Sequence, residues 1–194
     1  MFLYIVPFFI GIEIVRGDFY SLETRFLLDG ASSPSSFRTL FYGKAVLLVN
    51  SASECGYTDS HYRDLYRLQD ILGDRYFRVI VYPCNDFGKQ EPGSEKVIKD
   101  FIWWNYGDVP FLVGEKLSIL DKETRHPIYQ FIQDSTSSLP DWNFYKYLID
   151  HNGKVIGTFP HYQSVSAIFD NVHKAVKEAK NAGKKDKSLF KDEF

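Results

Sequence analysis

The sequence predicts an α/β fold with a central mixed sheet flanked by helices. Short continuous apolar runs at residues 45–49 and 77–82 are typical of strands buried on both faces, and each is followed by apolar residues at helical spacing. Further along, Asn152 and Gly153 separate two more apolar runs, which is a strong hairpin signal. The chain has 194 residues, of which 44% are hydrophobic, so it suits one domain with one core.

The first half of the chain is expected to hold short strands and one helix. Residues 18–30 are interpreted as a short strand that ends in an Asp-Gly turn, and residues 31–36 as a small-residue loop. After the strand at 45–49, Thr58 or Asp59 is expected to cap a helix. The core-facing side of this helix is predicted to carry Tyr62, Leu65, Tyr66, Leu68 and Leu72.

The second half is expected to contain two helices and a hairpin. Pro92 suits the first turn of the next helix. The core residues of that helix are predicted to be Val97, Ile98, Phe101 and Ile102. The runs at 145–149 and 155–159 are the predicted hairpin strands. The last helix is predicted to present an apolar stripe of Val165, Ile168, Phe169, Val172 and Val176.

The order of these elements predicts a thioredoxin-like fold. Strand, helix, strand, helix, strand, strand and helix imply two parallel crossovers, then an antiparallel hairpin and a closing helix. Residues 105–141 fall outside this order and are interpreted as an insertion before the final hairpin. The predicted domain spans residues 18–180, and residues 181–194 are expected to form a tail of basic and acidic residues.

The two ends of the chain resemble targeting signals. The apolar part of residues 1–17 is shorter than the roughly 20 residues that a bilayer-spanning helix needs. We therefore interpret it as a signal peptide rather than as a membrane anchor or a buried strand. The final Lys-Asp-Glu-Phe differs from the retention signal Lys-Asp-Glu-Leu only in its last residue. Together the ends predict a protein of the endoplasmic reticulum lumen without stable membrane insertion, in a compartment where disulfides persist.

Charge and composition narrow the range of partners. The net charge of −2 gives no general attraction to nucleic acid or to an anionic membrane. Lysines gather near the C-terminus, but acidic residues are interleaved with them, as on a solvated helix face. We predict no nucleic-acid partner, no metal site and no cofactor.

Cys55, in the segment NSASECGYTDSHYRDL, lies where chemistry is favoured in the predicted fold. It follows the carboxyl end of a buried strand and precedes a helix, whose free amide groups and dipole favour a thiolate. Three interpretations remain open: half of a structural disulfide, an unreactive core thiol, or a reactive nucleophile. No Cys-x-x-Cys pair is present, and the other cysteine, Cys84, follows the second strand. A disulfide needs Cα atoms roughly 4.4–6.8 Å apart, so pairing could require a loop to move.

Three segments resemble the active-site blocks of the glutathione peroxidase family. They are KAVLLVNSASECGYTDSHYRDLYRL, VIVYPCNDFGKQEPGSEKVIKDF and DWNFYKYLIDHNGKVIGTF, in the order and spacing of the family. The resemblance covers approximately residues 20–178. It implies a catalytic tetrad of Cys55, Gln90, Trp142 and Asn143. The amide and indole N–H donors of the last three suit a thiolate and a developing oxyanion.

The resemblance also implies a reaction cycle. Hydrogen peroxide or a lipid hydroperoxide would oxidise Cys55 to a sulfenic acid, and Cys84 would resolve this acid to a disulfide. A protein disulfide isomerase-like dithiol or glutathione would then reduce the disulfide. The alternatives are a non-turnover redox sensor or binding protein of the same fold, and a secreted domain with a structural Cys55–Cys84 disulfide.

Departures from the family pattern indicate a subtype. The attacking position holds cysteine rather than selenocysteine, and the segment 130–139 is short. These features resemble the monomeric, phospholipid-hydroperoxide type and the cysteine members of the endoplasmic reticulum. The blocks carry no obvious basic cluster for the carboxylates of glutathione. Residues 106–125 match the family poorly, and no role is predicted for them.

Overall fold

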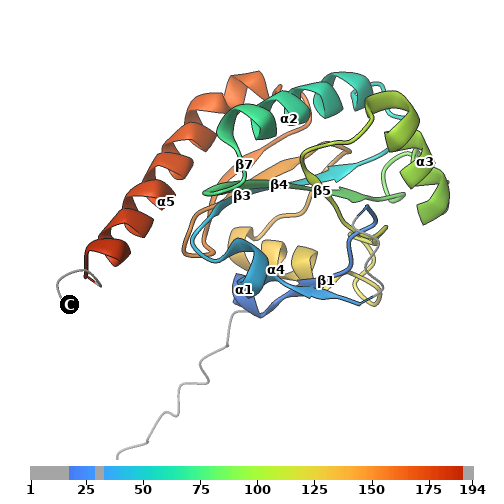
Figure 1. Ribbon diagram of the computed structural model, residues 1–194. Helices are drawn as coiled ribbons and strands as arrows, with labels where there is room; N and C mark the ends of the chain where they lie inside the picture. Colours follow the sequence, from blue (N-terminus) through green and yellow to red (C-terminus); the bar gives the residue numbers. More distant parts are fainter. Residues whose placement is uncertain (1–17, 29–32, 190–194) are drawn as a thin grey trace, which may run out of the picture.

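A five-stranded mixed sheet with helices on both faces forms the centre of the computed structural model, which describes residues 18–28 and 33–189 (Figure 1). The strand order is β5-β4-β3-β6-β7, and a separate pair, β1-β2, lies beside it. The strands are β1 (Glu23–Thr24), β2 (Ser35–Ser36), β3 (Ala45–Ser51), β4 (Phe77–Pro83), β5 (Leu112–Val113), β6 (Lys146–Ile149) and β7 (Val155–Phe159). The helices are α1 (Phe37–Phe41), α2 (Thr58–Leu72), α3 (Glu95–Tyr106), α4 (Pro127–Thr136) and α5 (Phe169–Leu189), with short 3₁₀ turns at Phe19–Ser21 and Ser166–Ile168.

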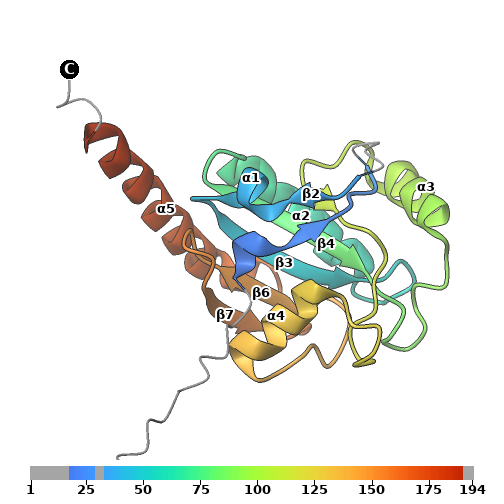
Figure 2. The ribbon, with the colours of Figure 1, turned by 90° about the horizontal axis from the view of Figure 1, so that it is seen from below.

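The helices form two layers around the sheet. Helices α2 and α5 cover one face, and α1 and α4 cover the other (Figures 1 and 2). All seven residues of β3 are buried, because this strand is central and both of its faces are covered. Alternate residues of β3 serve different cores: Leu47 and Val49 pack under α2 and α5, whereas Val46 and Leu48 pack towards α1 and α4. We call the cluster under α2 and α5 the upper core, and the cluster towards α1 and α4 the lower core.

The two parallel crossovers of the predicted fold are present, but the second one ends on a different strand. Strand β4 runs parallel to β3, and β5 runs parallel to β4, with α2 and α3 in the two connections. The prediction took the strand at 145–149 as the next strand after α3, whereas this strand, β6, pairs antiparallel with β3. The predicted insertion at 105–141 therefore holds the edge strand β5 and the helix α4. The two residues of β5 are too few to show a strand pattern in the sequence.

The prediction of a strand at residues 18–30 is mostly wrong for the residues of this segment that the structure describes. This segment begins with a 3₁₀ turn, and only Glu23 and Thr24 pair as β1, with a partner strand inside the predicted loop at 31–36. The predicted Asp-Gly turn lies outside the described residues. Helix α1 follows, and its rings make edge-to-face contacts, with ring centres 5.0 Å apart for Phe37 and Phe41.

Three details of the predicted helices are also wrong. Neither Thr58 nor Asp59 caps α2: the helix begins at Thr58, whose hydroxyl donates to the Ala52 carbonyl at 2.6 Å. Tyr66 of α2 and Val97 of α3 are exposed rather than core-facing. Pro92 precedes α3, which is capped by Ser94, whose hydroxyl oxygen accepts a hydrogen bond from an amide in the first turn.

The hairpin prediction is confirmed, and the last helix is longer than expected. The Asp150 carboxylate accepts bonds from the amides of Asn152 and Lys154, while Gly153 adopts a positive φ of 81° in the turn between β6 and β7. Helix α5 extends to Leu189, inside the predicted tail. Among the described residues, no helix combines the length and the apolar character needed to cross a membrane. The predicted signal peptide and the final Lys-Asp-Glu-Phe lie outside the described residues.

Candidate active site

The four residues predicted to form a catalytic tetrad follow or precede strands that meet at one edge of the sheet. Cys55 follows β3 and Gln90 follows β4, and these strands are parallel. Trp142 and Asn143 precede β6, which is antiparallel to β3, so its amino end lies beside the carboxyl end of β3. The mixed sheet thus gathers residues from three distant segments at the edge where α/β folds usually bind ligands.

Cys55 lies in a tight connection between β3 and α2. The amide of Thr58 donates to the Cys55 carbonyl at 3.0 Å, and the Thr58 hydroxyl bonds back to Ala52. The connection is therefore closed on itself just before the first turn of the helix. Cys55 is 8% exposed and belongs to the upper core, so only a small part of this residue reaches the surface.

Gln90 and Asn143 are joined by a hydrogen bond that fixes the orientation of both amides. The Nδ2 atom of Asn143 donates to Oε1 of Gln90 at 2.9 Å and to the Phe87 carbonyl at 3.2 Å. Both N–H bonds of Asn143 are thus engaged, and this side chain has no donor left for a thiolate. Since the oxygen of the Gln90 amide faces Asn143, its NH₂ group points elsewhere. The family resemblance implied two amide donors, whereas in the part of the chain that the structure describes the Asn143 NH₂ is engaged and the Gln90 NH₂ makes no hydrogen bond.

Trp142 lies against the loop that carries Gln90. A Cβ atom built on Gly88 would come within 3.1 Å of the Trp142 ring and 3.4 Å of the Gln90 side chain. Gly88 also has a positive φ of 65°, so glycine is required there for its backbone as well as for its size. The ring of Phe87 packs nearby, with its centre 6.5 Å from that of Trp142. Trp142 therefore covers the Gln90 loop directly.

A buried carboxylate, which the sequence analysis did not identify, ties the Cys55 segment to the Gln90 segment. Glu91 is 1% exposed, and its carboxylate accepts bonds from the amide of Ser53 at 2.9 Å and from the Ser53 hydroxyl at 2.7 Å. The amide of Glu54 also donates to the Gln90 carbonyl at 3.0 Å. Burial raises the pKa of Glu91, although its bonds with Ser53 oppose this shift. In the sequence, nothing distinguishes Glu91 from a surface glutamate beside a proline.

A second unrecognised residue, Asn50, holds the turn that carries Trp142. Its side-chain amide donates to the Trp142 carbonyl at 2.9 Å and accepts from the amide of Tyr145 at 3.1 Å. Its own carbonyl accepts from the amide of Phe144 at 2.7 Å. Asn50 directly follows the apolar run at residues 45–49 and is still part of β3, and a polar residue at the end of such a run was the one signal that could have revealed it.

Cys84 lies in a different environment from Cys55. It is fully buried in the lower core, whereas Cys55 belongs to the upper core. Both thiols are free. Burial raises the pKa of Cys84 to about 12, and the amide of Asp86, which contacts its Sγ at 3.5 Å, opposes this shift. The sequence placed both cysteines at strand ends, but it did not reveal that they pack in different cores.

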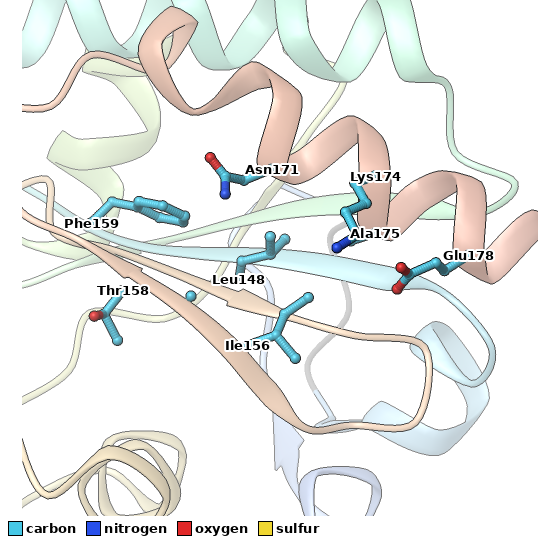
Figure 3. Close-up of a pocket in the computed structure, with 9 residues that line it drawn as sticks. Leu148, Ile156, Thr158, Phe159, Asn171, Lys174, Ala175 and Glu178 are labelled. Atoms are coloured by element: carbon cyan, nitrogen blue, oxygen red, sulfur yellow. The ribbon is translucent and has the colours of Figure 1, made fainter.

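A hollow of about 370 Å³ lies elsewhere, between the β6–β7 hairpin and α5 (Figure 3). Its floor is apolar, with Leu148 and Phe159, and Lys174 and Glu178 lie along the helix side. None of the four tetrad residues lines this hollow. Within residues 18–28 and 33–189, no three His, Cys, Asp or Glu side chains are grouped so that they could hold a metal ion.

Comparisons with known proteins point to one family. The glutathione peroxidase family model matches residues 20–133. Similar proteins include probable glutathione peroxidase 8-B of Xenopus laevis, 44% identical over 140 residues, and glutathione peroxidase 7 of Bos taurus, 39% identical over 151 residues. The first match covers 72% of this chain and 64% of the Xenopus protein, and the second covers 78% of each chain. The match thus spans less than two thirds of the Xenopus relative.

Solved structures extend the similarity to the fold. A crystal structure of Trgpx in apo form is 28% identical, with a TM-score of 0.64, and the match covers 83% of this chain and 96% of that one. A thiol:disulfide interchange protein of the thioredoxin family from Chlorobium tepidum shares the fold, with a TM-score of 0.56 at 19% identity over 80% of this chain and 93% of that one. The thioredoxin-like fold predicted from the sequence is confirmed.

Proposed function

This chain belongs to the glutathione peroxidase family, and we propose that it is a thiol peroxidase in which Cys55 attacks the peroxide. The Cys55 thiolate forms a bond to the terminal peroxide oxygen, and the O–O bond breaks. Cys55 becomes a sulfenic acid, and the leaving oxygen takes a proton to give water or an alcohol. The position of Cys55 before the amino end of α2 supports this role, because the amide groups there favour an anion.

The observation that carries the proposal is the hydrogen bond between Asn143 and Gln90. It occupies the Gln90 oxygen, so the Gln90 NH₂ group is the part of the amide that is available to an anion. In the proposed site this NH₂ and the indole N–H of Trp142 donate to the thiolate and to the oxyanion that develops on the leaving oxygen. Asn143 contributes by fixing the Gln90 amide.

The second half of the proposed cycle uses Cys84 as the resolving thiol. Cys84 attacks the sulfur of the Cys55 sulfenic acid, a disulfide forms and water leaves. The two thiols occupy different cores, so this step requires a rearrangement of one or both loops. The same separation argues against a permanent structural bridge. A protein disulfide isomerase-like dithiol or glutathione then reduces the disulfide by exchange.

A steady-state assay on residues 18–194 tests the proposal. Hydrogen peroxide and a phospholipid hydroperoxide serve as substrates, and glutathione and a disulfide isomerase serve as alternative reductants. We expect peroxide consumption over many turnovers with at least one reductant. A single oxidation event per molecule, with no turnover under any reductant, would identify a redox sensor instead. The monomeric state and the location in the endoplasmic reticulum lumen stay predictions, the latter because it depends on residues outside the described ranges.

A further inference from the structure

The turn that carries Trp142 and Asn143 contains a backbone conformation that needs support. Phe144 has a positive φ of 62°, in the left-handed region that is unfavourable for a non-glycine residue. Its side chain is fully buried and is held by two aromatic neighbours. The His61 ring lies 4.9 Å from the Phe144 ring, centre to centre, and the Tyr62 ring lies 6.0 Å away.

The main chain of this turn is held by Lys146, the first residue of β6. The Nζ atom of Lys146 donates to the Phe144 carbonyl at 2.7 Å and to the Pro160 carbonyl at 3.2 Å. Pro160 directly follows β7, so one ammonium group joins the segment before β6 to the segment after β7. The Lys146 side chain is fully buried.

The surroundings of this ammonium make it unusual. Among the described residues, no carboxylate forms an ion pair with Lys146. Burial lowers the pKa of Lys146 to about 8, so the group still carries its proton at neutral pH. Its ionisable neighbour is His61, whose pKa is lowered to about 4, first by burial and then by the charge of Lys146. The His61 imidazole is therefore neutral and does not compensate the charge of Lys146.

An unpaired buried charge is costly, and an apolar residue of similar length would fill the same space without that cost. Packing alone therefore does not explain a lysine at this position. The two carbonyl bonds do, since an aliphatic side chain cannot supply donors to Phe144 and Pro160.

We propose that Lys146 is a positioning residue of the peroxide-reducing site, whose ammonium holds the Phe144 carbonyl and thereby keeps Asn143 in place to orient Gln90. The effect passes from Lys146 to Phe144 through a hydrogen bond, and from Phe144 to its chain neighbour Asn143. It then reaches Gln90 through the hydrogen bond that the Asn143 amide donates to the Gln90 oxygen. This inference rests on the proposed function, because it assumes that the Gln90 amide serves the reaction of Cys55.

A double-mutant cycle tests this route. The second-order rate constant for oxidation of Cys55 by hydrogen peroxide is measured in wild type, Lys146→Met, Asn143→Ala and the double variant. We expect Lys146→Met to be roughly tenfold slower, because small misplacements of a catalytic group cost this much or more. Adding Lys146→Met to Asn143→Ala should change the rate less than about twofold, since both act through one amide.

The control is Tyr147→Phe, a change in the adjacent buried residue of β6, whose side chain packs in the lower core. It removes a hydroxyl that has no hydrogen-bond partner among the described residues and keeps the ring that packs against Tyr145, so its rate should equal that of wild type. Fluorescence gives a second readout in a background with Trp103→Phe and Trp104→Phe, which removes two exposed indoles and isolates Trp142. The Trp142 emission should change in Lys146→Met and not in Tyr147→Phe.

Each outcome is decisive. A wild-type rate in Lys146→Met, a wild-type rate in Asn143→Ala, or full multiplication of the two effects would overturn the role of Lys146 while leaving Cys55 as the nucleophile. A wild-type protein whose Cys55 does not react with peroxide would overturn the proposed function itself. If Lys146→Met does not fold, Lys146→Gln, which is shorter and uncharged, replaces it in the same cycle with the same expectations.

Discussion

The two cysteines follow adjacent parallel strands, yet they lie in opposite environments. The chain turns from β3 into a short connection that places Cys55 in the upper core, with 8% of its surface exposed. Cys84 directly follows β4, is fully buried in the lower core, and has a pKa raised to about 12. A position at the end of a strand is therefore not sufficient to expose a thiol to solvent. The exposure of the thiol depends on the face of the sheet to which the chain turns after the strand.

The contrast implies an order of events. Because Cys55 retains some exposed surface and Cys84 has none, we expect a small peroxide to reach Cys55 without a large change in the fold, whereas Cys84 must leave a buried, protonated state before it can attack another sulfur. The first step of the proposed cycle should therefore depend on the local site, and the second on loop movement. The predictions below separate these two steps.

The largest expected effect is the loss of peroxide chemistry in Cys55→Ser. This variant should show no oxidised adduct after a peroxide pulse, because the proposed first step has lost its nucleophile. Cys84→Ser should react at nearly the wild-type rate, accumulate the Cys55 sulfenic acid and proceed to the sulfinic acid under excess peroxide. Intact-mass spectrometry of both variants distinguishes these products. Similar adducts on both variants, or on neither, would contradict the assignment.

The next largest effect concerns the free amide of Gln90. Gln90→Leu keeps the approximate size of the side chain but removes its donors, so the rate of Cys55 oxidation should fall roughly 100-fold. Gln130→Leu is the matched control, since Gln130 is an exposed residue of α4 whose amide bonds to Asp134 at 2.8 Å. Stopped-flow measurement of both variants at neutral pH provides the comparison. A Gln90→Leu rate within threefold of the control would remove Gln90 from the site.

The sequence predicted the long elements of this fold because each carries a repeating pattern. The continuous run of β3, the helical spacing of α2 and the turn signal at Gly153 were sufficient to place them. Strands β1, β2 and β5 have two residues each, and no periodicity can exist over that length. Their position depends on tertiary pairing alone, which a single sequence does not display.

In the candidate site, too, some residues were predicted from the sequence and others were not. Cys55, Gln90, Trp142 and Asn143 were named from a family resemblance, and the structure adds which atoms face one another. Asn50, Glu91 and Lys146 were not recognised, because a buried polar residue reads in the sequence like a surface one until its partners are known. Asn143 was expected to donate to the thiolate, but its amide donates to Gln90 instead. The sequence could not reveal this either, because it does not show which side chains are partners.

A smaller effect should appear in the pH dependence of stability of the reduced protein. The pKa of the Cys84 thiol is about 12 in the folded state and near 9.0 in the unfolded state. The contribution of the buried Cys84 thiol to the free energy of unfolding is therefore fully present below pH 9. It falls as the pH rises from 9 towards 12, by about 2 kcal/mol at about pH 10.5. Denaturant unfolding of Cys84→Ala should show a shallower alkaline loss than Cys55→Ala.

The buried tyrosines of the lower core also make the folded protein less stable at alkaline pH. Burial raises the pKa of Tyr82, Tyr129 and Tyr147. They are present in both variants, so the difference between the two slopes compares the Cys84 thiol with the Cys55 thiol. Equal slopes would mean that Cys84 is accessible in the folded state, and the contrast between the cysteines would disappear.

The smallest effect tests whether the bond between Ser53 and Glu91 limits the second step. This bond and the one between Glu54 and Gln90 hold the Cys55 segment against the segment that follows Cys84. Glu91→Gln replaces charge-assisted hydrogen bonds by neutral ones, which weakens the contact by about 1 kcal/mol. If loop opening precedes disulfide formation, conversion of the sulfenic acid to the Cys55–Cys84 disulfide should become roughly fivefold faster.

Glu95→Gln is the control for this change, because Glu95 is a carboxylate of α3 that pairs with Arg25 and does not contact the Cys55 segment. Rapid quenching with a thiol-alkylating reagent, followed by mass spectrometry, measures disulfide formation separately from the first oxidation. A rate in Glu91→Gln that equals the control would mean that the rearrangement does not require this contact to break. A slower rate would mean that Glu91 instead guides the two loops towards each other, and the contact would then assist resolution rather than restrain it.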